Sequence, residues 1–213
     1  MNDFNINNYM VVKKAISTEM AKFIYDYICL RRKIAGYLFE EKLIPAFTQH
    51  FGYWGDGQVD NTYHVYGDTV MEILLLKLKP LMEKQIEQEL IEMYSYCRIY
   101  KKDDVLDRHK DRPSCEISTT MNLGGDPWPI YLDPTNTDIP PENDPYKVIG
   151  NKGMKVELDP GDMLIYKGCV LEHWRESFQG NNCAQVFLHY NIKNEDSEKI
   201  KYDSRKFIGI PKI

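Results

Sequence analysis

The sequence lacks the features that mark secreted, membrane-spanning and zinc-finger proteins. It has no stretch of 18 apolar residues, and its first segment, Met1 to Tyr9, lacks the basic and then apolar pattern of a secretory leader. Its cysteines are odd in number, widely spaced and without a Cys-x-x-Cys pair, so we expect neither a disulfide framework nor a structural zinc site. We therefore predict a cytoplasmic protein with no membrane contact and with five reduced thiols: Cys29, Cys97, Cys115, Cys169 and Cys183.

The sequence also lacks an excess of positive charge. The 213 residues include 27 Lys and Arg against 32 Asp and Glu, a net charge of −5, and no run of five basic residues occurs. This balance argues against a protein that binds mainly by neutralising phosphates, so we expect no nucleic-acid partner. Hydrophobic residues make up 43% of the chain. That fraction is enough to bury a substantial core, and the length predicts one domain over residues 1–213.

The residue pattern changes near Ile91. We expect mainly helical support over residues 1–90, a strand-rich core over 91–192 and a C-terminal extension over 193–213. Short segments rich in Tyr, Ile, Val and Thr, separated by turn residues, predict an α+β protein in which helices cover one face of an antiparallel sandwich or barrel. The predicted strands are 93–100, 116–123, 129–132, 147–149, 154–158, 163–166 and 184–190.

Two long helices are predicted in the first part. Ser17 or Thr18 can cap the first one, and Thr69 with Glu72 has the spacing of a capping box at the start of the second. Pro80 is expected to disturb the second helix. Their apolar residues are expected to pack on the core: Met20, Phe23, Ile24, Tyr27, Ile28 and Ile34 in the first, and Ile73, Leu74, Leu76 and Leu78 in the second.

Three residues form a candidate metal site. His109 and Asp111 end one extended segment and point to the same side, because residues i and i+2 of a strand share a face. His173 follows the turn 159–162 by the length of one strand. Two histidines and one carboxylate are the facial triad of non-haem Fe(II) oxygenases, which leaves the other metal positions open. The alternative for His109 and Asp111 is a solvated surface turn.

With its neighbours, this triad carries a family resemblance. The order Tyr100, His109-x-Asp111, Leu123-Gly124-Gly125-Asp126, 158–164 (LDPGDML) and His173 resembles the double-stranded β-helix, or jelly-roll, core of 2-oxoglutarate/Fe(II)-dependent dioxygenases, in the prolyl 4-hydroxylase-like branch. The resemblance covers Tyr94 to Tyr190. It implies that the two histidines and the aspartate hold Fe(II). It also implies that Tyr100 contacts the 2-oxoglutarate carboxylate.

The sequence departs from that family at one position. A basic residue about ten positions after the distal histidine commonly anchors the far carboxylate of 2-oxoglutarate, but this chain has Cys183 there. A buried carboxylate needs a charge-assisted partner, and a guanidinium suits it best. Arg98, on the strand face of Tyr100, is the first candidate, and its alternative is an ordinary surface ion pair. Arg175 is the second, Arg112 and Lys167 are less well placed, and Gln185 could add a hydrogen bond.

The resemblance implies hydroxylation of a C–H bond, with Fe(II), 2-oxoglutarate as co-substrate and, as an optional cofactor, ascorbate. Asp111 favours hydroxylation over halogenation, because related halogenases replace this carboxylate by a small residue. The substrate suggested is a peptidyl proline or another amino-acid residue, with free amino acids and small metabolites also open, and the loops 48–61 and 133–144 are candidate lids.

Two other classes of function stay open: a zinc site of hydrolytic type, and a non-catalytic β-barrel binding module. The remaining histidines, His50, His64 and His189, lack partners at ligand spacing and are expected to be structural or at the surface. The sequence does not indicate the oligomeric state.

Overall fold

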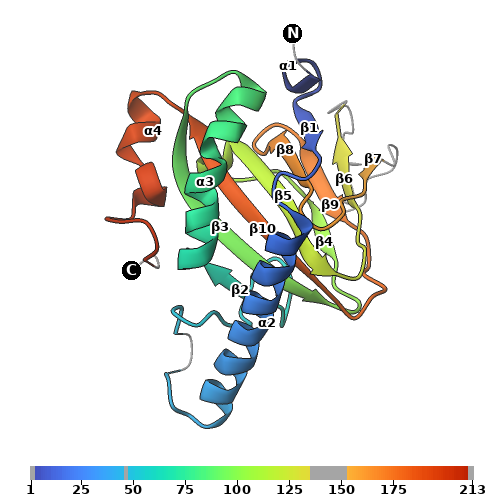
Figure 1. Cartoon of the computed structure of the whole chain (residues 1–213), viewed down its shortest axis with the longest axis vertical. Coiled ribbons are helices and arrows are strands. Elements are labelled where there is room, and N and C mark those ends of the chain that lie inside the picture. The colour runs from blue at the N-terminus through green and yellow to red at the C-terminus, as the bar shows by residue number, and fades with distance from the viewer. Residues whose placement is uncertain (1–2, 46–47, 135–152, 211–213) are drawn as a thin grey trace, which may run out of the picture.

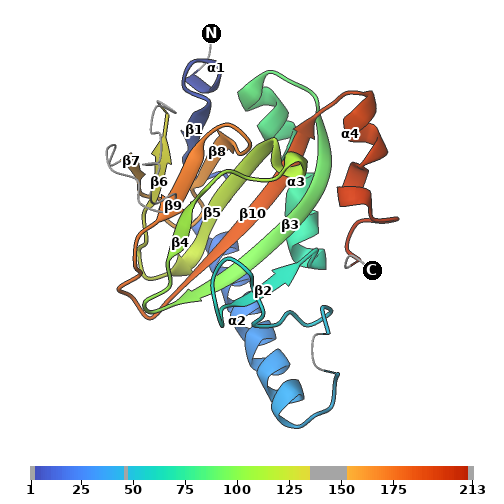
Figure 2. The same ribbon diagram turned by 180° about the vertical axis from the view of Figure 1, so that it is seen from behind.

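The computed structural model describes residues 3–45, 48–134 and 153–210. Two antiparallel sheets face each other, and the two long helices cover the outer face of the larger sheet (Figures 1 and 2). The larger sheet has the order β1-β8-β5-β10-β3-β2, and the smaller has the order β4-β9-β6-β7. This arrangement confirms the predicted α+β class with a jelly-roll core.

The strands of the larger sheet are β1 (Tyr9–Val12), β2 (Tyr63–Tyr66), β3 (Leu90–Lys101), β5 (Ile117–Gly125), β8 (Met163–Lys167) and β10 (Asn182–Ile192). Those of the smaller sheet are β4 (Leu106–His109), β6 (Ile130–Asp133), β7 (Met154–Val156) and β9 (Glu172–Arg175). Six of the seven predicted strands correspond to these elements. The seventh, 147–149, and most of the predicted lid 133–144 lie outside the described residues.

The helices are α1 (Asp3–Asn7), α2 (Thr18–Glu40), α3 (Thr69–Ile86) and α4 (Glu195–Lys199), with 3₁₀ turns η1 (Pro113–Cys115) and η2 (Lys201–Ser204). Ser17 caps α2 as predicted, because its side chain accepts a hydrogen bond from the Met20 amide. Within the described part of the chain, no helix is both long and apolar enough to cross a membrane.

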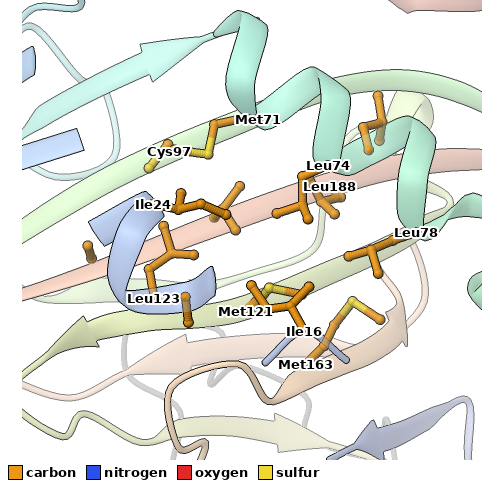
Figure 3. Close-up of a cluster of buried hydrophobic side chains, with 14 of the residues drawn as sticks. Ile16, Ile24, Met71, Leu74, Leu78, Cys97, Met121, Leu123, Met163 and Leu188 are labelled. Carbon is orange, nitrogen blue, oxygen red and sulfur yellow. The ribbon is translucent and has the colours of Figure 1, made fainter. Parts of the chain in front are cut away.

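The main core lies between the two long helices and the larger sheet. Figure 3 shows Ile24 of α2 and Leu74 of α3 pointing toward Leu123 and Leu188 of the sheet strands. All four side chains are buried. A second apolar cluster fills part of the space between the two sheets and includes Tyr100 and Trp128. The helices thus support the larger sheet from outside, and its inner face carries both apolar and polar residues.

The prediction for the apolar stripe of α2 is partly wrong. Ile24 and Ile28 are buried, but Phe23 is 70% exposed, and Met20 and Ile34 are also exposed. The face that packs on the sheet is completed by small residues instead, including Ala21 and Ala35. Small side chains allow the helix to approach the sheet closely, so the packing face is rotated from the most hydrophobic face.

The predicted cap of α3 is wrong by one residue. Asp68, rather than Thr69, is the cap and accepts hydrogen bonds from the amides of residues 70 and 71. Glu72 is not free to complete a capping box, because its buried carboxylate binds Arg205 and the Ser95 amide. The helix continues through Pro80 to Ile86. Ile73 and Leu76, predicted to be buried, are exposed on its outer side.

Candidate active site

The structure brings His109, Asp111 and His173 together between the two sheets. His109 is the last residue of β4 and lies opposite His173 of β9 in the strand register. Their ring centroids are 4.3 Å apart. Asp111 Oδ1 lies 3.5 Å from His173 Nε2 and 3.7 Å from His109 Nε2. One ligand atom from each residue therefore falls within 4.8 Å of the other two.

Backbone carbonyls fix the orientation of both imidazoles. His109 Nδ1 lies 2.7 Å from the Asp107 carbonyl oxygen, and His173 Nδ1 lies 3.1 Å from that of Leu171. A carbonyl only accepts, so each Nδ1 donates its proton and each Nε2 points toward Asp111. Neutral imidazoles would then place two nitrogen lone pairs against a carboxylate oxygen. A proton or a metal cation between these acceptors makes the arrangement favourable, and the donor set fits a facial Fe(II) site.

Asp111 is held from its other side. Its backbone amide donates to the Gly168 carbonyl at 2.9 Å, and its Oδ2 accepts from Ser118 Oγ at 2.6 Å. Ser118 Oγ also lies 3.0 Å from Nδ1 of His189. The Asp111 carboxylate is therefore oriented by an outer hydrogen-bond network before any ligand arrives.

The electrostatics of the site favour an ionised Asp111 and an uncharged His109. Burial would raise the pKa of Asp111, but the hydrogen bond and charge of His173, with the Ser118 hydroxyl, outweigh it and hold that pKa well below its usual range. Burial, reinforced by the charge of His173, lowers the pKa of His109. Burial also lowers the pKa of His189 to about 4. Near neutral pH the aspartate is thus ionised, and His109 and His189 are uncharged.

Gly168 provides the space that Asp111 needs. A Cβ atom at this position would lie 2.6 Å from Ser118 Oγ and still closer to the Asp111 carboxylate and the Cys115 carbonyl oxygen. We therefore expect Gly168→Ala to displace Asp111 and to weaken Fe(II) binding by about 10–100-fold, as loss of an outer-sphere partner does. Anaerobic titration with Fe(II) measures this change. Gly57→Ala is the matched control, because a Cβ there meets no atom within 4 Å. Equal affinities for the two variants would contradict this assignment.

Arg98, the first candidate for the carboxylate anchor, is buried and already paired. Its guanidinium binds Asp56 of the Gly-rich segment 48–61, with Nε donating at 2.8 Å. It also donates to the Tyr100 hydroxyl at 2.9 Å and to Gln58 Oε1 at 3.1 Å. The pairing predicted as an alternative for Arg98 thus exists, but it is an interior ion pair rather than a surface one.

Arg175, the second candidate, is buried without an anion. It is 1% exposed, and its guanidinium donates to the Trp128 carbonyl and, at 3.2 Å, to Thr120 Oγ1. Its Nε has no hydrogen-bond partner, and within the described segments no carboxylate lies at ion-pair distance. Burial lowers the pKa of Arg175. An interior cation without a carboxylate partner is costly, so the Arg175 guanidinium is chemically suited to bind an anion.

Arg175 also lies beside Cys183, the position where the family resemblance implies a cation. Its charge acts to lower the pKa of the Cys183 thiol, although burial raises that pKa overall. Gln185 lies next to this thiol, at 3.1 Å, and accepts from Thr120 Oγ1 at 3.2 Å. A basic side chain of β9 thus lies beside the position in β10 where the resemblance implies one.

The two basic residues predicted to be less well placed, Arg112 and Lys167, contact other groups. Arg112 forms two hydrogen bonds of 2.8 Å with Asp203 and lies over the Tyr94 ring. Lys167 lies over the ring of Phe4 at the N-terminus. Neither side chain is directed at the region around Cys183 by these contacts.

A cavity of about 400 Å³ surrounds the triad. Asp56 and Gln58 line it, so the Gly-rich segment 48–61 lies at the site as expected. A second cavity of about 350 Å³ adjoins it, since Asp56, Tyr96 and Arg112 line both. Together the two cavities extend from the triad to the C-terminal turn η2.

Sequence reasoning missed several residues of the site. Ser118, Gly168 and Asp56 are brought to the triad by strand pairing and by a loop, and none has a local sequence signal for its contact. His189 was expected to be structural or at the surface, and it is buried and one hydrogen bond removed from Asp111. His189 is an even number of positions from Cys183 and Gln185 on the same strand, so it shares their face. This spacing was the available indication that His189 faces inward.

No family model and no curated protein matches this chain in sequence. Solved structures do match. A prolyl-4-hydroxylase from Pseudomonas putida superimposes with a TM-score of 0.59 at 8% identity, over 90% of this chain and 96% of that one. HygX from Streptomyces hygroscopicus, with nickel and 2-oxoglutarate bound, gives 0.58 at 13% identity, over 89% and 85%. The viral collagen prolyl hydroxylase vCPH from Paramecium Bursaria Chlorella virus-1 gives 0.54 at 9% identity, over 90% and 100%.

These likenesses extend over nearly the whole chain, and further similar structures are described as an epimerase and a carbocyclase. At identities of 8 to 13% they concern the fold and not the reaction. The chain has the fold of the 2-oxoglutarate- and Fe(II)-dependent oxygenases.

Proposed function

We propose that this protein is an Fe(II)- and 2-oxoglutarate-dependent dioxygenase that hydroxylates a C–H bond. The observation that carries the proposal is the convergence of His109, Asp111 and His173, with the three ligand atoms within 4.8 Å of one another on one side of a cavity. The similar structures with nickel or iron and 2-oxoglutarate bound support the same cofactors.

In this proposal the three residues hold the ferrous ion. When bound, the ion couples oxidative decarboxylation of 2-oxoglutarate by dioxygen, giving succinate and carbon dioxide, to insertion of one oxygen atom into a substrate C–H bond. Asp111 fills a coordination position that a halide would need, which favours hydroxylation over halogenation. The surrounding hydrophobic and aromatic residues exclude water from the reacting centre.

We assign the far carboxylate of 2-oxoglutarate to Arg175, with Thr120 and the Tyr100 hydroxyl as hydrogen-bonding neighbours. The contacts favour Arg175 over Arg98, because Arg98 already has a carboxylate partner in Asp56. The role we propose for Arg98 is to hold the segment 48–61 over the cavity through Asp56 and Gln58.

Arg98→Ala should therefore lower stability more than it lowers 2-oxoglutarate affinity. The substitution leaves the buried Asp56 carboxylate without its cation, although Tyr96 and the Gln58 amide still donate to it. We expect a loss of about 1–3 kcal/mol in the free energy of unfolding, the cost of an under-satisfied buried group. Urea denaturation measures this loss. An unchanged stability together with a large loss of 2-oxoglutarate affinity would return the anchor role to Arg98.

For the substrate we propose a proline-containing peptide. The groove formed by the two cavities is lined by tyrosines, Tyr94 and Tyr96 near the triad and Tyr53 and Tyr66 farther along. Extended proline-rich segments dock in aromatic-lined grooves of this kind. The similar structures include two prolyl hydroxylases, but also HygX with hygromycin B bound, so a small molecule is the competing substrate class.

One set of experiments tests the proposed function. Anaerobic addition of Fe(II) and 2-oxoglutarate should give the visible charge-transfer absorption of the chelate, and admission of oxygen should give succinate. A panel of proline-rich peptides and small amines should then contain one that gains a single oxygen atom. Succinate formation with zinc in place of iron, or in the absence of oxygen, would contradict the dioxygenase proposal.

The contacts of Arg175 disfavour the hydrolytic zinc site. A hydrolytic site needs no cation for 2-oxoglutarate, whereas Arg175 places one beside Cys183. The non-catalytic binding module predicts no stabilisation by metal, whereas a ligand that binds only the native state raises the melting temperature. Addition of Fe(II) alone should therefore raise the melting temperature if the triad binds metal, and should leave it unchanged if the protein is a non-catalytic binding module.

A further inference from the structure

The outer face of α2 carries an unpartnered apolar seam. Its members recur at alternating intervals of three and four residues, which is the a and d pattern of a coiled coil. Within the described residues, nothing covers the most exposed of them, Phe23 and Leu30, the latter 58% exposed. The a positions are Met20, Tyr27 and Ile34, and the d positions are Phe23, Leu30 and Tyr37.

Five of the six seam residues lie away from the face that packs on the sheet, whereas Tyr27 lies between the two faces, because it packs partly against the core and its hydroxyl donates to Asp68 at 2.8 Å. Ile24, Ile28 and Ala35 are buried on the sheet side, and Trp54 of the following loop contacts Gly36 and Phe39 on the other flank. A surface helix of a single soluble domain normally has its polar residues outside. Five exposed large apolar side chains along one side of a 23-residue helix instead mark an interaction site.

We propose that α2 pairs with α2 of a second copy of this chain in an antiparallel, two-fold symmetric coiled coil. In this pairing each a residue faces a d residue of the partner copy: Met20 faces Tyr37, Phe23 faces Ile34, and Tyr27 faces Leu30. The same contacts recur by symmetry, so all six seam residues find a partner. The interface is self-complementary, as two-fold symmetry requires.

The flanking charges fit the antiparallel direction. Asp26 and Lys33 stand at the g positions that face each other in this pairing, so two ion pairs form by symmetry. Asp26 now binds Lys22 at 2.9 Å in an exposed pair that contributes little and is easily exchanged. At each end of the pairing, Glu19 of one copy faces Glu40 of the other. These like charges repel each other, but solvent screens the repulsion.

The size and position of the seam also fit. The exposed fractions of its side chains correspond to roughly 500 Å² per copy, or roughly 1,000 Å² in the pair, the lower limit for a stable interface. The first half of α2 lies over the large sheet, whereas its second half extends past the sheet edge (Figures 1 and 2). Antiparallel pairing places each body beside the projecting half of the partner helix and so avoids a clash between bodies.

Sedimentation velocity of the full chain between about 1 and 100 μM tests the pairing, since micromolar association is expected for an interface at this limit. Leu30→Glu should weaken the dimer by at least about tenfold, because it places two charges in the seam. Ile73→Glu is the matched control, since Ile73 is an apolar residue of α3 with 59% exposure outside the seam. Circular dichroism should show that both variants stay folded. A chain that stays monomeric throughout, or a dimer indifferent to Leu30→Glu, overturns the proposal.

A charge exchange tests the direction of the helices. Asp26→Lys alone and Lys33→Asp alone should each weaken the antiparallel dimer, because each creates like-charge pairs, and the double variant should restore it. In a parallel pair, Asp26 would instead face Arg31 of the partner copy, and Lys33→Asp could not rescue Asp26→Lys. Failure of the rescue therefore overturns the antiparallel arrangement.

Discussion

His109→Ala is expected to abolish the Fe(II)-2-oxoglutarate absorption and oxygen-dependent succinate formation. The residue contributes one of the three ligand atoms. Loss of a group that only supports a ligand costs up to about 100-fold in metal affinity, so loss of a ligand itself should lower Fe(II) affinity by more than about 100-fold. His109 is partly exposed at the end of a short strand, so the metal-free protein should remain folded. Anaerobic titration with Fe(II), followed by succinate detection, measures both effects.

His50→Ala is the control for this substitution, because His50 is exposed and distant from the triad in the described contacts. It should bind Fe(II) as the unchanged protein does. Undiminished Fe(II) binding by His109→Ala would contradict the assignment of the facial triad and therefore the dioxygenase proposal.

Arg175→Met is expected to lower the affinity for 2-oxoglutarate without lowering the stability of the metal-free protein. Truncating one partner of a buried charge pair costs about 2–5 kcal/mol, so 2-oxoglutarate affinity should fall by at least about 30-fold. The metal-free protein should be as stable as before or more stable, since the substitution removes an interior cation for which the described residues offer no carboxylate. Melting curves with and without 2-oxoglutarate, in the presence of Fe(II), measure both quantities.

Arg98→Ala serves as the contrasting variant in the same measurements. Both arginines are buried, but Arg98 is neutralised by Asp56, so its removal should lower the melting temperature and leave most of the 2-oxoglutarate response. If Arg175→Met lowers stability while 2-oxoglutarate still shifts the melting curve fully, Arg175 has a structural role, and the triad assignment is unaffected.

Local patterns in the sequence were sufficient for much of the framework. Alternating β-branched and aromatic residues between turn signals located the long strands β3, β5 and β10 within about three residues of their ends. Ser17 or Thr18 was predicted as the cap, because a hydroxyl next to the first helical residues bonds to amides within three residues, and the structure selects Ser17. The candidate ligands His109, Asp111 and His173 were found because the chemistry of the set restricts which residue types can form it.

Periodicity alone could not orient the helices. It shows which residues share a face and not what that face contacts, so the apolar stripe of α2 was assigned to the core, although Phe23 and Ile34 lie outside it. The prediction of a capping box in α3 was wrong for a related reason. Glu72 has a buried partner, Arg205, that is 133 residues away in sequence.

The sequence by itself determined the long core strands, the two long helices and the three residues that can bind one metal ion, because these depend on short-range geometry and on residue chemistry. Only the tertiary structure decided which arginine is left with an unpaired interior charge, that Gly168 makes room for Asp111 and that the seam of α2 lies outside the core. Those features depend on which strands and loops become neighbours, and contacts between residues far apart in the chain leave no local pattern to follow.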